Sequence, residues 1–169
     1  NYEMTTEGEV GGYRVALPVI DIHTIGAGGG SIAHIDKGGL LEVGPQSAGA
    51  SPGPACYMQG GVEPTVTDAN LVLGYLNENY FLGGDIPLDK DAAMRAVKAR
   101  IADPLGMETV QAAHGIHKLT NANMADAIRV MSVQKGHDPR LFALLAAGGA
   151  GPAHAARLAQ AVGLPRVIV

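Results

Sequence analysis

Apolar and polar positions follow two different periods along this chain, and together they predict a mixed α/β fold. Short apolar runs bounded by glycine or proline are typical of strands. Strands are expected over 14–25, 31–36, 40–43, 141–147 and 166–169, the fourth of them buried on both faces. Apolar residues at helical spacing predict helices over 67–76, 89–103, 108–135 and 153–162.

Polar residues mark the ends of these helices. The side chains of Thr67 and Asp89 can cap the first two helices, and Gly136 ends the longest one. Asn121 and Asn123 lie in the middle of that longest helix, although asparagine is a poor helix former. Local conflicts of this kind are frequent at functional sites, so both asparagines are candidates for a role in function.

The last 30 residues predict a strand, a glycine turn, a helix and a second strand. Such a unit normally gives two neighbouring parallel strands with a right-handed crossover. Ligands of these sheets gather beyond the carboxyl ends of the strands, where Gly148, Gly149 and Gly151 lie. These glycines can present an anion or nucleotide surface at the start of the helix. The alternative is that they allow close packing of helix on strand.

A second glycine cluster follows the strand expected over 14–25. Gly26, Gly28, Gly29 and Gly30 are followed by Ser31. Glycines so close together weaken helices and strands, and bare backbone N–H groups can point at a phosphate. The dinucleotide fingerprint needs a third glycine where Ser31 stands, and a P-loop needs a lysine directly after its last glycine. We therefore expect a strand–turn–strand clasp around a phosphate, or else a tight glycine hairpin without a ligand.

Polar side chains flank this cluster. In a regular strand Asp21 and His23 share one face and Thr24 lies on the other. Asp21 could bind magnesium or orient water, or it could be a solvated aspartate at a strand end. His23 is either an acid–base group or a hydrogen-bonded structural histidine. The Ser31 hydroxyl could donate to phosphate or could cap the turn.

Other candidate side chains have simpler explanations beside the functional ones. Asp68 and Asn70 suit helix capping, or a metal or substrate at the mouth of a cleft. His114 and His117 share a helical face, but no third ligand at useful spacing supports a zinc site.

We expect His154 to be structural, with a pKa that the helix dipole lowers. Cys56, the single cysteine, has no base nearby in the sequence and is expected to be a buried thiol.

Composition narrows the possible partners. The net charge is −4 and aromatic residues make up 4% of the chain, which argues against nucleic acid. No apolar run is long enough for a membrane span, so a cytoplasmic location is the default expectation.

A Gly-, Pro- and Ser-rich stretch over 44–66 is a candidate functional loop. The chain begins without methionine and stops inside an expected strand, so we expect it to be truncated at both ends.

Several segments resemble the signature of the hydantoinase A / 5-oxoprolinase family. The similar segments cover nearly the whole chain after about residue 10 and occur in one order, which makes the resemblance specific. They are Asp21 to Ala33, Val43 to Tyr57, Pro64 to Gly74, Asn121 to Arg129, Lys135 to Arg140 and Ala147 to His154.

The resemblance implies a lobe of an actin-like, sugar-kinase-like ATPase fold, in which two lobes hold a nucleotide between them. Residues 1–13 would be a linker or a strand from the preceding part, and 14–169 the second lobe. ATP and Mg²⁺ are the implied cofactors. Asp21 would bind magnesium or act as the base. Thr24 and the turn from Gly26 to Ser31 would contact the phosphates, and Gly148 to Gly151 the adenosine.

The implied activity is ATP-dependent hydrolysis of a cyclic amide of the hydantoin or 5-oxoproline type, through phosphoryl activation of the carbonyl oxygen. Asp68 would serve a second metal. Family members act with a hydantoinase B-type subunit or domain, and we expect an oligomer. The motif of the first lobe is absent, so the chain alone is expected to be inactive. Alternatives are the ATP-using subunit of a ketone carboxylase and a non-catalytic assembly module.

Overall fold

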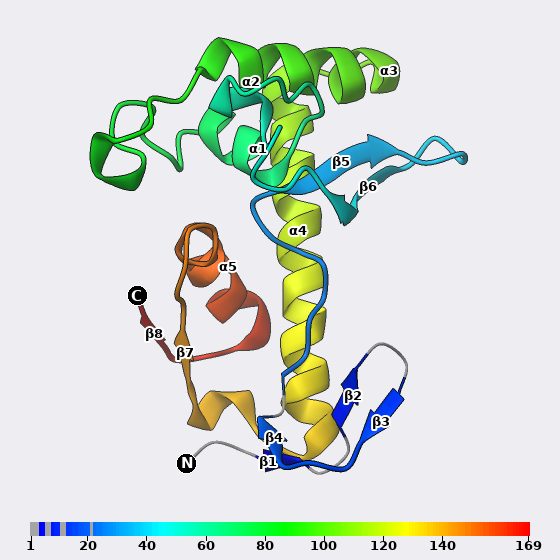
Figure 1. Ribbon diagram of the computed structural model, residues 1–169, viewed down its shortest axis with the longest axis vertical. Coiled ribbons are helices and arrows are strands. Elements are labelled where there is room, and N and C mark those ends of the chain that lie inside the picture. The colour runs from blue at the N-terminus through cyan, green and yellow to red at the C-terminus, as the bar shows by residue number, and fades with distance from the viewer. Residues whose placement is uncertain (1–3, 6–7, 11–12, 21) are drawn as a thin grey trace.

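The computed structural model of this protein describes residues 4–5, 8–10, 13–20 and 22–169. In Figure 1 the helix α4 (Thr109–Met131) runs along the long axis of the molecule, and the other elements pack at its two ends and along its side. The helices α1, α2 and α3 and the hairpin β5–β6 lie at one end of α4, α5 packs beside its middle, and β1 to β4 lie near its other end.

The strands of the described residues pair two by two. β1 (Met4–Thr5) pairs antiparallel with β4 (Val19–Ile20), and β2 (Gly8–Val10) with β3 (Tyr13–Val15). β5 (Ser31–Ile35) and β6 (Leu41–Ser47) form an antiparallel hairpin. β7 (Ala143–Leu145) and β8 (Arg166–Ile168) are parallel and are joined through α5 (Gly151–Val162), which confirms the expected strand–helix–strand unit.

The strand expected over 14–25 is wrong as a continuous element. β3 ends at Val15, and β4 begins only at Val19, after Pro18. Proline has no backbone N–H and cannot continue a ladder of hydrogen bonds. Residues 22–25 have no regular structure, so the glycine cluster is not the turn of a hairpin. His23 therefore does not lie on a strand, so the prediction that it shares a strand face with Asp21 is wrong. Asp21 itself lies outside the described residues.

The first helix begins earlier than expected. α1 (Val66–Val72) is capped by Thr65 and not by Thr67, because Thr65 and Asp68 form a reciprocal capping box. Asp89 caps α2 (Lys90–Val97) as predicted, accepting a hydrogen bond of 2.8 Å from the Ala92 N–H. A wider helical turn over Lys98–Ala102 continues α2 into α3 (Asp103–Leu105), which fulfils the single helix expected over 89–103.

Short helical turns complete the described elements. They are Ala55–Tyr57, Leu82–Gly84, Val133–Lys135 and Pro139–Leu141. The third of them continues α4, so the expectation of a helix over 108–135 that ends at Gly136 is confirmed. Of the helices in the described part of the chain, none has both the length and the apolar run needed to cross a bilayer.

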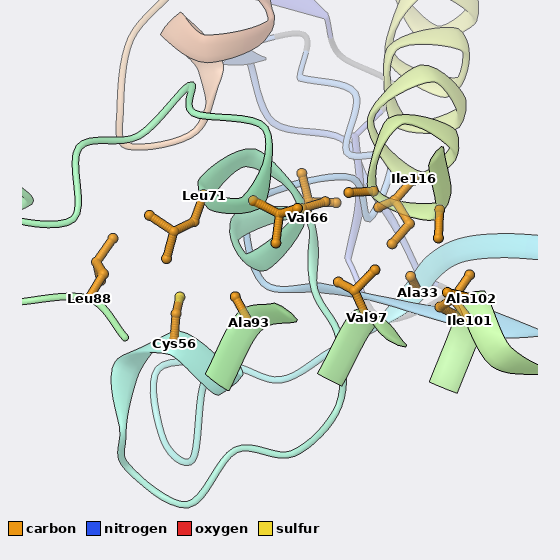
Figure 2. Packing of buried hydrophobic residues seen from close by; sticks show 14 residues of the cluster. Ala33, Cys56, Val66, Leu71, Leu88, Ala93, Val97, Ile101, Ala102 and Ile116 are labelled. Carbon is orange, nitrogen blue, oxygen red and sulfur yellow. The ribbon is translucent and has the colours of Figure 1, made fainter. Parts of the chain in front are cut away.

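The hydrophobic core lies between α1, α2 and α4, with the β5–β6 hairpin packed against it (Figure 2). Every residue of α1 is buried, and Leu71, Val97 and Ile116 are among the largest apolar side chains with almost no exposed surface. Burial of side chains of this size stabilises the fold by about 1.5–3 kcal/mol each. The core therefore fixes α1, and α1 in turn supports the two glycine clusters.

The strand expected to be fully buried over 141–147 is exposed. Leu145 in β7 is 71% exposed and Ile168 in β8 is 55% exposed. The cause is that α5 covers one face of this two-stranded sheet, and nothing in the described residues covers the other face (Figure 1).

Candidate functional site

The turn from Gly26 to Ser31 is held together by its own serine. The Ser31 hydroxyl donates to the Gly26 carbonyl at 3.0 Å and accepts from the Gly28 N–H at 2.9 Å. Ser31 is 3% exposed, and Gly26 has a φ of +59°, which favours glycine. The serine hydroxyl is already used on both sides, so the geometry favours turn capping over donation to a phosphate.

The middle of this turn is anchored to α1. The Gly29 carbonyl accepts hydrogen bonds from both the backbone N–H and the hydroxyl of Thr67, each at 2.9 Å. The Gly30 carbonyl accepts from the Ala48 N–H at 2.8 Å. Within the described part of the chain, the N–H groups of Gly29 and Gly30 donate to no acceptor. The carbonyls of this turn anchor it to the protein. Its unused N–H groups, on partly exposed residues, remain able to donate to an anion.

The second glycine cluster lies at the start of α5. Gly148 has a φ of +86°, and the helix begins at Gly151 with Ala150 as its N-cap residue and no side chain capping it. A Cβ atom added at Gly148, Gly149 or Gly151 would meet no atom within 4 Å. Close packing of helix on strand therefore does not explain these glycines. An uncapped helix start with open space in front of it suits an anionic or nucleotide ligand.

The two glycine clusters meet in the folded chain, although more than a hundred residues separate them. A Cβ atom on Gly29 would lie 3.3 Å from the Cβ of Ala150, the N-cap residue of α5. The same atom would lie 2.7 Å from the Thr67 hydroxyl. The unused amides of the first turn and the open start of α5 thus border one place on the surface.

His23 and Thr24 lie beside the first turn. Both are exposed, and they line a hollow of about 450 Å³ together with residues from the glycine turn and β6. Its other lining residues are Ile25, Gly26, Ala27, Gly28, Gly30, Ser31, Pro45 and Ser47. The structure therefore brings His23, Thr24 and the glycine turn together, in agreement with their grouping as a candidate site.

A second hollow, of about 460 Å³, adjoins the first across Gly26, Ala27 and Pro45. The apolar side chains of Ile25, Leu40, Leu41, Val43 and Leu119 line it. Asn123, one of the two mid-helix asparagines, also lines it from α4. Glu42 lines it as well, so the hollow offers apolar side chains together with a few polar groups, as sites for small molecules commonly do.

Asp68 has a structural position that differs from a metal site. Its carboxylate is fully buried and accepts four hydrogen bonds, with lengths of 2.8–3.2 Å. The donors are the N–H groups of Ala55, Cys56 and Thr65 and the Thr65 hydroxyl. Both oxygens are occupied, so the geometry favours capping over magnesium binding. The described residues contain no group of three His, Cys, Asp or Glu side chains placed to hold a metal.

A buried polar network joins α1, α4 and α5. The Asn70 side chain pairs with the Nδ1 of His117 at 2.8 Å and with the Nε2 of His154 at 3.1 Å. The Nδ1 of His154 pairs with the Oδ1 of Asn121 at 2.9 Å. The two imidazole rings stack with centroids 4.7 Å apart, and Tyr75 stacks on the other face of His117.

Sequence reasoning named these polar residues separately and missed the network. The signal that could have revealed the network is that these polar residues recur on helix faces that are otherwise apolar.

Burial controls the protonation of this network. Removal from water and, to a smaller extent, the neighbouring His117 together lower the pKa of His154 to about 4. Burial also lowers the pKa of His117. The structural role expected for His154 agrees with this position. The main cause of its low pKa is burial, and not the helix dipole that the sequence suggested.

Comparison with known proteins finds relatives that match most of this chain. It is 54% identical over 157 residues to the caprolactamase subunit alpha of Pseudomonas jessenii, covering 93% of this chain and 23% of that protein. The crystal structure of ATP-dependent caprolactamase from the same organism matches with a TM-score of 0.89 and 52% identity, over 97% of this chain and 24% of that one. The nucleotide-free structure of acetone carboxylase matches with a TM-score of 0.90 and 35% identity, over 99% of this chain and 24% of that one.

This chain spans about a quarter of the length of these relatives. Its mixed α/β fold is shared with two solved structures, and the resemblance seen in the sequence extends to the three-dimensional arrangement. The model of the Hydantoinase/oxoprolinase family matches residues 1–169, and the chain therefore belongs to that family.

Proposed function

We propose that this chain is the second lobe of an actin-like ATPase domain, and that residues 14–169 form that lobe. The observation that carries the proposal is the meeting of the two glycine clusters at Gly29 and Ala150. Two loops with unused amides, brought together from distant parts of the sequence, suit a ligand with several anionic groups. The membership of the family and the ATP-dependent relatives favour ATP as that ligand.

In this proposal the N–H groups of Gly29 and Gly30 donate to phosphate oxygens, and the start of α5 faces the nucleotide. Thr24 and His23 line the hollow beside Gly28 and Gly30, and in this proposal their side chains lie near the reacting group. Asp21 remains our candidate for holding Mg²⁺ or acting as the base, on the strength of its place in the sequence. The bound ATP supplies the phosphoryl group that activates a carbonyl oxygen for attack by water.

We infer that the whole enzyme hydrolyses a cyclic amide. An amide carbonyl is a poor electrophile, so coupling to ATP gives the reaction a better leaving group. The hollow lined by apolar side chains, Asn123 and Glu42 adjoins the glycine turn and can hold a small ring that carries one amide. Its apolar lining can hold the methylene groups, while the Asn123 carboxamide can pair with the N–H and C=O of the substrate.

A ketone carboxylase subunit is the second candidate. The fold matches acetone carboxylase as well as it matches caprolactamase, with TM-scores of 0.90 and 0.89, although the sequence identity is lower, at 35% against 52%. A small ketone also fits this hollow, and Asn123 can donate one hydrogen bond to its oxygen. Both candidates require partner subunits, and we propose a hydantoinase B-type partner in a cytoplasmic oligomer.

The test is ADP release by the complete protein that contains this chain, assayed with its partner subunit. Caprolactam, hydantoin, 5-oxoproline and acetone with bicarbonate are supplied in turn. Stimulation by a cyclic amide supports the hydrolase, and stimulation by the ketone supports the carboxylase. Absence of ADP release with every compound would favour the non-catalytic assembly module.

The Asp21 proposal has its own variant. Asp21→Asn is expected to abolish the dependence of ADP release on Mg²⁺ concentration and to reduce turnover at least about a hundredfold. Asp36→Asn is the matched control, because Asp36 is a carboxylate in the exposed turn after β5 that bonds only to the N–H groups of Gly38 and Leu40 in the described residues. An Asp21→Asn enzyme with unchanged magnesium dependence would exclude Asp21 as the metal ligand.

A further inference from the structure

The helix α1 contacts the first glycine cluster and the first turn of α5 through two side chains on one of its faces. Thr67 in its first turn holds Gly29 by two hydrogen bonds of 2.9 Å. Asn70 lies three residues later, one helical turn away, and pairs with His154 at 3.1 Å. His154 is in the first turn of α5, three residues after Gly151. One short helix therefore determines the spacing of the two clusters.

The hydrogen bonds fix the orientation of every group in this connection. The Asn70 amide can donate only through Nδ2 and accept only through Oδ1. Its Nδ2 therefore donates to the Nε2 of His154, and its Oδ1 accepts from the Nδ1 of His117. His154 is then neutral, with its proton on Nδ1 and donated to the Oδ1 of Asn121. His154 can accept from Asn70 only in this one tautomer.

Burial makes this connection stiff. Asn70 is 1% exposed, His154 is fully buried and His117 is 3% exposed. Breaking a hydrogen bond in such a place leaves a buried polar group without a partner and without water, which is strongly unfavourable. Apolar side chains would pack α5 against α1 without fixing its position along the helix. Directional bonds fix that position, and an error of about 1 Å in a binding site can cost a hundredfold in rate.

We propose that Asn70 is a positioning residue of the nucleotide site, which acts through His154 to hold the start of α5 at a fixed distance from the Gly29 turn. This inference rests on the proposed function, since it needs a ligand that bridges the two clusters. It assigns α1 the role of a bracket, with Thr67 holding one cluster and Asn70 the other. Asn70 touches neither the nucleotide nor the substrate in this proposal.

The experiment measures the affinity of the complete protein, with its partner subunit, for ADP with Mg²⁺ by calorimetry. Asn70→Leu keeps the side-chain volume and removes both hydrogen bonds, and His154→Leu removes the acceptor. Each variant is expected to weaken ADP binding about tenfold, and the KM for ATP is expected to rise more than kcat falls. Because both residues act in one connection, the double variant is expected to bind no more weakly than either single variant.

Two further variants separate positioning from general destabilisation. Thr120→Val removes a buried hydrogen bond within α4, between the Thr120 hydroxyl and the Ile116 carbonyl. It is expected to lower the stability without changing the ADP affinity by more than about twofold. His154→Gln retains an acceptor near the Nε2 position, and it is expected to recover most of the affinity that His154→Leu loses. This rescue also tests the connection should Asn70→Leu fail to fold.

The outcomes distinguish the two proposals. If Asn70→Leu and His154→Leu bind ADP as tightly as a wild-type protein that binds it normally, the positioning role of Asn70 is overturned. The proposed function then stays intact. Loss of affinity in simple proportion to loss of stability, with Thr120→Val included, would also overturn the positioning role. Absence of ADP binding by the wild-type protein would overturn both.

Discussion

Thr67 and Gly29 are joined by two hydrogen bonds that end on one atom. The carbonyl oxygen of Gly29 accepts from the backbone N–H and from the hydroxyl of Thr67, and both distances are 2.9 Å. Residues 38 positions apart in the sequence are thereby held at the point where the glycine turn passes the first turn of α1. This contact leaves no room for a side chain at Gly29.

The first prediction concerns that missing side chain. Gly29→Ala places a Cβ 2.7 Å from the Thr67 hydroxyl and 3.3 Å from the Cβ of Ala150, so the turn must move. We expect a loss of about 1–3 kcal/mol in the free energy of unfolding, measured by denaturant titration. Gly28→Ala is the control, because its Cβ would meet nothing within 4 Å. Equal stability of the two variants would show that the turn is not anchored as described.

The second prediction concerns the carboxylate of Asp68. Asp68→Asn replaces an acceptor by an NH₂ group facing the donors of Ala55, Cys56 or Thr65. Breaking a buried, charge-assisted network by changing one member costs about 3–5 kcal/mol, and we expect a loss near that range in denaturant titration. We also expect no change in the dependence of ADP release on Mg²⁺ in whatever protein remains folded. A selective loss of magnesium dependence would restore Asp68 as a metal ligand.

The third prediction is a pH dependence of stability. Burial lowers the pKa of His154 to about 4 in the folded protein, whereas an unfolded histidine has a pKa near 6.5. The unfolded state therefore binds more protons between these values. Stability is full above about pH 6.5 and falls as the pH drops towards 4, by up to about 1.4 kcal/mol per pH unit for this one group.

Its measurement is the free energy of unfolding across that pH range. His117 on α4 faces His154 and contributes in the same direction, because its pKa is also lowered. Besides burial, His114 on α4 and then Arg157 on α5 lower the pKa of His117. His154→Gln is expected to flatten the slope relative to that of the wild-type protein. A slope that persists in His154→Gln would assign it to other groups.

Some elements of the fold follow from local sequence. The Asp89 cap, the long helix that ends at Gly136 and the parallel pair around α5 all depend on signals within a few residues of each other. The prediction of one strand over 14–25 is wrong because it followed the run of apolar residues and gave too little weight to Pro18, which interrupts the strand. The exposed face of β7 could not be predicted, since burial of a strand depends on elements that lie far away in the sequence.

The candidate site shows the same division. Each glycine cluster was recognisable by itself, because the density of glycine is a local property. Their meeting at Gly29 and Ala150 depends on how α1 packs against α4 and α5, which local patterns do not encode. The roles of Ser31 and Asp68 were also undecided in the sequence, since the same hydroxyl or carboxylate serves a ligand or the backbone according to which N–H groups surround it.

The last prediction concerns the single cysteine of this chain. Cys56 has no exposed surface, and burial, together with the nearby Asp68 carboxylate, raises the pKa of its thiol well above the usual value. The reactive thiolate is therefore almost absent near neutral pH. We expect iodoacetamide to leave Cys56 unmodified in the folded protein and to modify it fully in denaturant, as measured by peptide mass spectrometry. Asp68→Asn, which loosens the backbone around Cys56, is expected to speed this modification. Fast alkylation of the native wild-type protein would contradict the burial of Cys56 and the structural role assigned to it.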